Sequence, residues 1–194
     1  MAVVSLKYKS KQGTLTAPGD VDPGAMIPLI TTTLSTTTAS VTFSNIPAVY
    51  SHLQIRGIAR TNAASTADYP QIRFNSDSGS NYAHHLLYGD GSAAGVAATT
   101  STDIISASYI TGINSTASIF GAFVIDVLDY ANTSKYKTMR ALGGADQNGS
   151  GQLRYYSGLW MSTSAINSIT ITAFTGSFVQ YSQFALYGIK GAGA

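Results

Sequence analysis

In the stretch His52-Leu53-Gln54-Ile55-Arg56-Gly57-Ile58-Ala59-Arg60, small or apolar residues alternate with mostly polar ones. The alternation separates two sets: Leu53, Ile55, Gly57 and Ala59 in one, and Gln54, Arg56, Ile58 and Arg60 in the other. Successive side chains of a β-strand point to opposite faces, so one set would face a core and the other would face water. The pattern therefore predicts a half-buried strand.

Outward from this strand, the chain continues in short apolar or alternating runs. We expect further strands at Ile27–Leu34, Ser40–Ser44, Gln71–Phe74, Tyr82–Tyr88, Asp103–Ile110, Ser118–Leu128, Tyr136–Leu142, Gln152–Met161, Ile166–Phe174 and Phe178–Lys190. Ser118–Leu128 is almost continuously apolar, which favours burial on both faces. Asp90-Gly91 and Asn148-Gly149 are typical of tight turns, whereas Gly91–Thr102 has no period and is interpreted as a long loop.

Regularly spaced short strands predict an all-β fold, an antiparallel β-sandwich of jelly-roll-like type, although the sequence does not order the strands. The composition agrees. The chain of 194 residues contains no glutamate, only 10% charged residues and 19 glycines, with serine and threonine at most polar positions. Such a composition disfavours helices and favours strands joined by tight turns. A single domain of ordinary size is expected.

The charge and the cysteine content exclude several classes of protein. The net charge of +2 provides no strong field for direct binding of nucleic acid or of an anionic membrane. No run of about 18 apolar residues is present, so no membrane span is expected, and the N-terminus does not have the pattern of a secretory signal. The chain has no cysteine, so disulfides do not stabilise the fold.

Residues 1–27 differ from the body, which we place at residues 28–194. Pro18, Pro23 and three glycines forbid a regular helix or a central strand, yet the segment is too apolar for a free tail. We expect an extended arm that binds a neighbouring protein; the alternative is a flexible, solvated terminus. The residues expected to bind the partner are Val3, Leu6, Lys7, Tyr8, Lys9, Lys11, Leu15 and Val21.

The residues needed for catalysis are scarce. The only histidines are His52, His84 and His85, and the last two would point to opposite faces of one strand, so they would not chelate one metal. No serine lies in a Gly-x-Ser-x-Gly elbow. A glycosidase needs two carboxylates, and Asp126 and Asp129 are the nearest candidates. They follow a buried strand, and we expect Asp129 to begin and cap the turn at residues 129–133 instead. We expect no catalytic, cofactor-binding or metal-binding residue. A polysaccharide-degrading enzyme is therefore a weaker hypothesis than the two structural roles described below.

Two further motifs are candidate ligand sites. Asn75-x-Asp77-x-Gly79 has too few acidic ligands for a calcium loop, and Asp20 and Asp22 would either share a cation between subunits or accept backbone hydrogen bonds. Aromatic residues are the remaining possibility. Tyr155, Tyr156 and Trp160 would form the best sugar-stacking cluster; the alternative for these rings is packing in the core or at a subunit interface.

Several segments of the sequence resemble small virion structural proteins of tailed bacteriophages. These segments are Gly13–Ala25, Tyr50–Gly57, Ile72–Asp77, Tyr136–Thr138, Tyr155–Trp160 and Phe184–Lys190. The resemblance covers almost the whole chain and contains no catalytic signature. It implies a particle component, a homotrimer, with an N-terminal arm anchored in the capsid or the tail.

The resemblance leads to two functional expectations. The first is a capsid decoration (cement) protein on the outer capsid surface, which stabilises the shell by binding the major capsid protein through its arm. The second is a tail-fibre or baseplate receptor-binding protein, which would bind tail proteins through the arm and a host surface glycan through its distal loops. These loops are Gly91–Thr102 and Gly143–Gly151.

Overall fold

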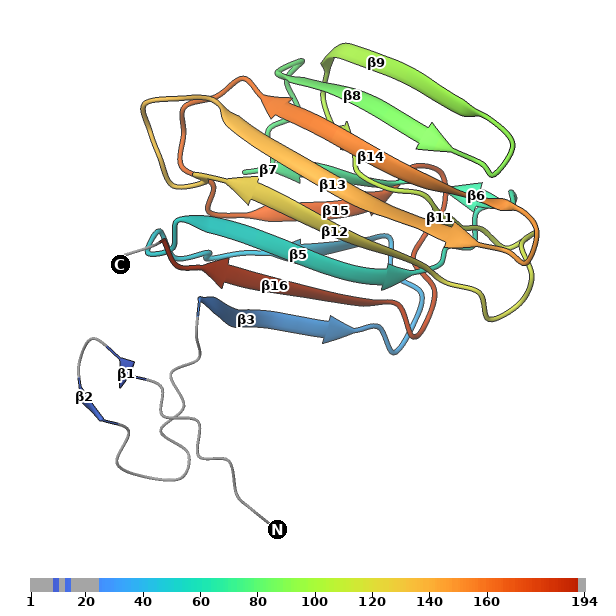
Figure 1. Ribbon diagram of the computed structural model, residues 1–194, viewed down its shortest axis with the longest axis horizontal. Coiled ribbons are helices and arrows are strands. Elements are labelled where there is room, and N and C mark those ends of the chain that lie inside the picture. Colours follow the sequence, from blue (N-terminus) through green and yellow to red (C-terminus); the bar gives the residue numbers. More distant parts are fainter. Residues whose placement is uncertain (1–8, 11–12, 15–24, 192–194) are drawn as a thin grey trace.

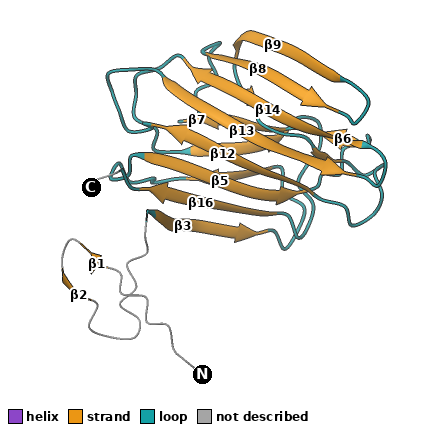
Figure 2. Ribbon diagram, in the orientation of Figure 1, coloured by secondary structure: helices purple, strands orange, loops and turns teal. Residues whose placement is uncertain are grey.

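The computed structural model describes residues 9–10, 13–14 and 25–191, and all regular structure in these residues is β-strand. Figure 1 shows a broad sheet in front of a smaller one, and Figure 2 shows that strands and loops account for the described chain. In spatial order, the eight-stranded sheet consists of β3 (Met26–Thr33), β16 (Gln183–Ile189), β5 (His52–Ala59), β12 (Gly121–Leu128), β13 (Lys137–Asp146), β14 (Gly151–Trp160), β8 (Tyr82–Gly89) and β9 (Ala94–Thr102).

The second sheet has four strands: β10 (Ile105–Ser106), β7 (Pro70–Phe74), β15 (Ile169–Ala173) and β4 (Ser40–Phe43). Two short pairs complete the described strands. They are β11 (Ile110–Thr111) with β6 (Ala67–Asp68), and β1 (Lys9–Ser10) with β2 (Gly13–Thr14). Pairing between these strands is antiparallel throughout. The prediction of an all-β antiparallel sandwich is confirmed.

The strand order is that of a jelly roll with two inserted hairpins. Eight strands, β3, β4, β5, β7, β10, β12, β15 and β16, make up the jelly roll in chain order. The first, eighth, third and sixth of them lie side by side in the large sheet, and the second, seventh, fourth and fifth form the small sheet. This alternation between sheets produces the two Greek keys of a jelly roll. The inserted strands β13–β14 and β8–β9 extend the large sheet beyond β12 (Figure 1).

One core lies between the two sheets, because each sheet turns its alternate apolar side chains toward the other. On β12 these are Phe123, Ile125 and Val127, each at most 5% exposed. Ala122, on the other face of the same strand, is exposed. The expectation that Ser118–Leu128 is buried on both faces is therefore wrong: the strand begins at Gly121, and the small sheet covers only one side of it.

The segment predicted as the loop Gly91–Thr102 is instead mostly strand. Its residues 94–102 form β9, the edge of the large sheet, and pair with β8. Nearly all residues of β9 are exposed. Since neither face of this strand is covered, its sequence has no hydrophobic period, and a pattern search cannot find it.

The tight turn predicted at Asn148-Gly149 is confirmed, but the expected loop Gly143–Gly151 is shorter, because residues 143–146 belong to β13 and residue 151 begins β14. Asn148 and Gly149 have φ angles of 58° and 103°, and the amide of Gln147 donates a hydrogen bond to the carbonyl of Ser150 at 2.8 Å. Positive φ at both central residues defines the tight hairpin turn that Asn-Gly favours.

Candidate functional site

His52, in β5, lies apart from the adjacent pair His84 and His85 in β8. The Asp129 amide donates a hydrogen bond to His52 Nδ1 at 3.0 Å, and the Asp129 carboxylate forms an ion pair with Lys135. The hydrogen bond from Lys135 lowers the pKa of Asp129. Asp129 begins the turn as predicted, because the Asn132 amide donates a hydrogen bond to its carbonyl at 3.0 Å, while its carboxylate binds Lys135. Asp126 accepts a hydrogen bond from Gln54 at 2.9 Å on the outer face of the large sheet.

His84 and His85 point to opposite faces of β8, as predicted. His84 is half-buried beside Tyr156, with ring centroids 5.8 Å apart, while His85 is exposed. Burial lowers the pKa of His84, and so does the neighbouring His85. Among the described residues there is no group of three His, Cys, Asp or Glu side chains that could hold a metal ion.

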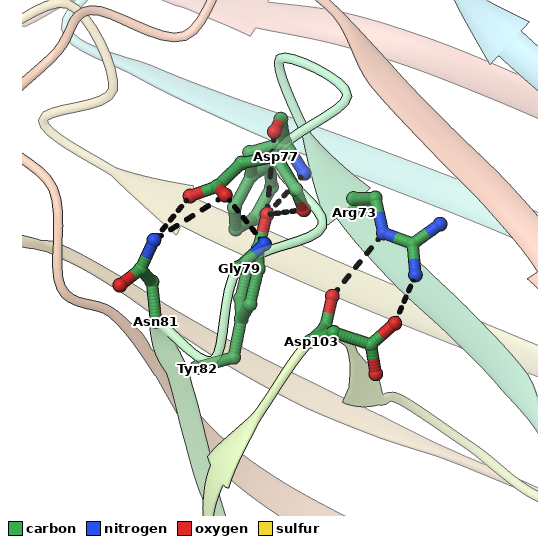
Figure 3. Close-up of polar contacts among 7 residues, drawn as sticks. Arg73, Asp77, Gly79, Asn81, Tyr82 and Asp103 are labelled. Carbon is green, nitrogen blue, oxygen red and sulfur yellow. Dashed lines mark hydrogen bonds and ion pairs between the residues drawn. The ribbon is translucent and has the colours of Figure 1, made fainter.

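Asp77, the central residue of the calcium-like motif, is bound by protein donors (Figure 3). Its carboxylate accepts hydrogen bonds from Trp160 Nε1 at 2.7 Å, Asn81 Nδ2 at 3.0 Å and the Gly79 amide at 2.9 Å. The bonds from Trp160 and Asn81 lower the pKa of Asp77. Nearby, Arg73 pairs with Asp103 at 2.5 Å. These contacts tie the loop between β7 and β8 to the end of β14.

The three residues of the predicted sugar-binding cluster do not come together on the surface. Tyr156 and Trp160 belong to the core and are 1% and 2% exposed, whereas Tyr155 is 43% exposed on the outer face. The reason is the two-residue period of β14, which places residues 156 and 160 on one face and residue 155 on the other. The cluster is therefore corrected to a single exposed tyrosine.

The predicted arm lies almost entirely outside the described residues. The structure describes only the backbone of Lys9 among the expected partner-binding residues, and it pairs with Thr14. The others stay predictions: Val3, Leu6, Lys7, Tyr8, Lys11, Leu15 and Val21.

Exposed apolar side chains gather on the outer face of the large sheet. The strand register aligns four of them with the half-buried Val124 in one line across β9, β8, β14, β13 and β12. We call this line the apolar row: Val96, Leu87, Tyr155, Leu142 and Val124. Four of its members are between 43% and 80% exposed. Individual exposed apolar residues are ordinary, but a contiguous row of them marks an interaction surface.

Beside the apolar row lies a second line, which we call the small-residue row. Its members are Ala94, Gly89, Leu153, Gly144 and Ala122, with Leu153 as the one large side chain. A hollow of about 620 Å³ lies over four of these five residues and reaches the hairpin tips at Asp90-Gly91 and Gly149-Ser150. Sequence reasoning missed this surface because both rows cross strands that are far apart in the chain.

Comparison of the chain with protein-family models gives no match, and a search of the curated proteins finds no similar sequence. Among the described residues, no helix has the length and apolar character to cross a membrane. The surface itself is therefore the starting point for the function.

Proposed function

We propose that this protein is a structural component of a tailed-bacteriophage particle, a capsid decoration protein that binds and stabilises the shell. In this proposal it is a homotrimer with no catalytic role, its jelly-roll body lies on the outer capsid surface, and its N-terminal arm binds the major capsid protein. The observation that carries the proposal is the uncharged apolar row on the outer face of the large sheet, a surface suited to protein contact. The resemblance of almost the whole sequence to small virion structural proteins supports it.

The proposed mechanism is mechanical. An arm that lies across neighbouring capsid subunits opposes their separation by the pressure of packaged DNA. Each arm contributes modest contact through Val3, Leu6, Tyr8, Leu15 and Val21, and many symmetric copies multiply the effect. Lys7, Lys9 and Lys11 would meet acidic capsid surface.

Deleting residues 1–24 tests this mechanism. The shortened protein should keep the β-sheet circular dichroism and thermal transition of the full chain, and it should no longer bind particles stripped of the protein. Changing Lys7, Lys9 and Lys11 together to Gln should weaken binding and reduce its salt dependence, whereas the control Lys135→Gln should bind normally. Normal decoration by the deleted protein would contradict the proposed role of the arm.

A second candidate is a tail-fibre or baseplate protein that recognises a host surface glycan. The hollow over the small-residue row favours it, because two hairpin tips, at Asp90-Gly91 and Gly149-Ser150, contribute to its lining. Ser150→Tyr would place a ring at this hollow, and Thr42→Tyr would place one on the outer face of the small sheet. On a glycan array, this candidate predicts binding that only Ser150→Tyr removes. No glycan bound by the unaltered protein would rule it out.

A further inference from the structure

The outer face of the large sheet has a pattern that complements itself. The two rows cross five of its strands. On four of these five, a large residue of the apolar row lies two positions from a small residue of the small-residue row: Val96 and Ala94, Leu87 and Gly89, Leu142 and Gly144, and Val124 and Ala122. On β14 both residues, Tyr155 and Leu153, are large. None of the ten residues in the two rows is charged. A ridge therefore runs alongside a trough across the sheet.

We propose that this face binds the same face of a second copy of the chain, around a two-fold axis that crosses the strands between the two rows. A rotation of 180° about that axis lays the apolar row of each copy on the small-residue row of the other. Leu87 then lies over Gly89 of the second copy, and Leu142 lies over Gly144. The contact is isologous, with the same patch used twice, as is usual in homodimers.

The centre of this contact is β14, the middle strand of the five. Here Tyr155 meets Leu153 of the second copy, and the symmetry repeats the pair. Both side chains are well exposed in the single chain, at 43% and 61%. A tyrosine packed against an aliphatic side chain at the middle of an interface is a typical energetic anchor.

Charges at the margin of the two rows are complementary under the same rotation. Arg140 precedes Leu142 by two residues on β13, and Asp146 follows Gly144 by two, so all four side chains share the outer face. The two-fold axis therefore places Arg140 of each copy over Asp146 of the other. Arg140 is exposed and has no hydrogen bond or ion pair within the described residues. Its cross-strand neighbour on β12, Asp126, forms no ion pair with it. The pairing would therefore add a carboxylate partner, Asp146 of the other copy, to each Arg140.

The size of the face is adequate for a specific dimer. Five strands spaced by about 4.8 Å and four rows spaced by about 6.8 Å cover roughly 24 by 27 Å. This approaches the roughly 800 Å² per partner of a standard interface. The strand directions of two packed sheets differ by about 30°. The rows of the two copies would therefore diverge with distance from the middle strand, and the match would be closest at β14. The pairing does not depend on the proposed virion role. Because it covers the apolar row, capsid binding by the paired protein would rest on the N-terminal arm.

A charge exchange on the full-length protein tests the pairing. Arg140→Asp or Asp146→Arg alone should raise the dissociation constant of the pair by more than about tenfold, since like charges then face each other. The combined variant with both changes should restore association. Thr42→Asp, which adds a negative charge to the outer face of the small sheet, is the matched control and should associate normally. Sedimentation equilibrium reports the mass in each case.

The unaltered protein should have the mass of a dimer, or of a hexamer if the two-fold pairs join trimers. Monomers or trimers at micromolar concentration would overturn the proposal, and so would a double variant that fails to recover.

A second measurement identifies the face directly. The natural chain has no cysteine, so Leu87→Cys protein mixed with Gly89→Cys protein should be linked by a short bis-maleimide. A cysteine at residue 89 meets only ordinary contact, 3.9 Å from the Ala93 carbonyl oxygen. Gly89→Cys mixed with Thr42→Cys is the control and should not be linked. Equal linking in both mixtures would also overturn the proposal.

Discussion

The carboxylate of Asp77 satisfies the buried indole N–H of Trp160, a residue only 2% exposed. Asp77→Ala would leave that donor without a partner and would also release Asn81 and the Gly79 amide. We expect the free energy of unfolding to fall by about 2 kcal/mol, measured by urea denaturation. Asp103→Ala, which breaks an exposed ion pair with Arg73, is the control and should cost less than about 1 kcal/mol. Equal losses in the two variants would contradict this account.

The same carboxylate predicts a pH dependence. The pKa of Asp77 is lower in the folded protein than its ordinary value because Trp160 and Asn81 donate to the ionised form. Its contribution to stability is therefore present above the unfolded-state pKa and is lost as the pH falls through the folded-state pKa. The stability difference between the natural protein and Asp77→Ala should narrow in acid. A difference that stays constant as the pH falls would show that the charge of Asp77 is not involved.

Arg60 holds a loop together through its guanidinium. The residue is 9% exposed, and its four hydrogen bonds of 2.7 to 3.2 Å go to the carbonyl oxygens of Ile113, Ser115, Thr116 and Ile119. Arg60→Met should lower the free energy of unfolding by about 3 kcal/mol, because these bonds are charge-assisted and partly buried. Arg56→Met changes an exposed arginine of β5, the strand that ends just before Arg60, and should cost less than about 1 kcal/mol in the same denaturation experiment.

At the scale of single elements, the two-residue period predicts faces well wherever one face is buried. It places Leu53, Ile55 and Ala59 in the core, as the structure does. The same period implies that Tyr155 and Tyr156, as consecutive residues of one strand, cannot lie on the same face. The period fails for β9, which has no buried face, and for Arg60, which follows the last residue of β5 and leaves the outer face for a loop.

The turn between β13 and β14 allows a clean test of backbone strain. Gly149 has a φ of +103°, and a Cβ added there would meet no atom within 4 Å. Gly149→Ala therefore changes backbone conformational energy alone and should destabilise the protein by about 1 kcal/mol. Ser150→Ala, at the next residue, should have little effect on the thermal unfolding midpoint. An equal shift in both variants would mean that side-chain contacts, rather than φ, govern this hairpin.

For the whole molecule, composition and strand spacing were sufficient to predict the sandwich but not the strand order. Pairing partners such as β16 and β5 are more than 100 residues apart in the chain. No local pattern in Gln183–Ile189 or His52–Ala59 indicates which strand is the pairing partner. The apolar row has the same origin: Val96 and Val124 lie on one surface only because β8, β14 and β13 pair in order between their strands. Long-range register is therefore what the sequence leaves undetermined, and the surface proposed for association depends on it.

The virion role is tested most directly by copy number. Quantitative mass spectrometry of purified particles would compare this protein with the major capsid protein. Our account predicts on the order of hundreds of copies per particle, because decoration acts through many weak, symmetric contacts. A few to a few dozen copies would contradict decoration and favour a position in the tail, and absence from the particle would contradict the virion role altogether.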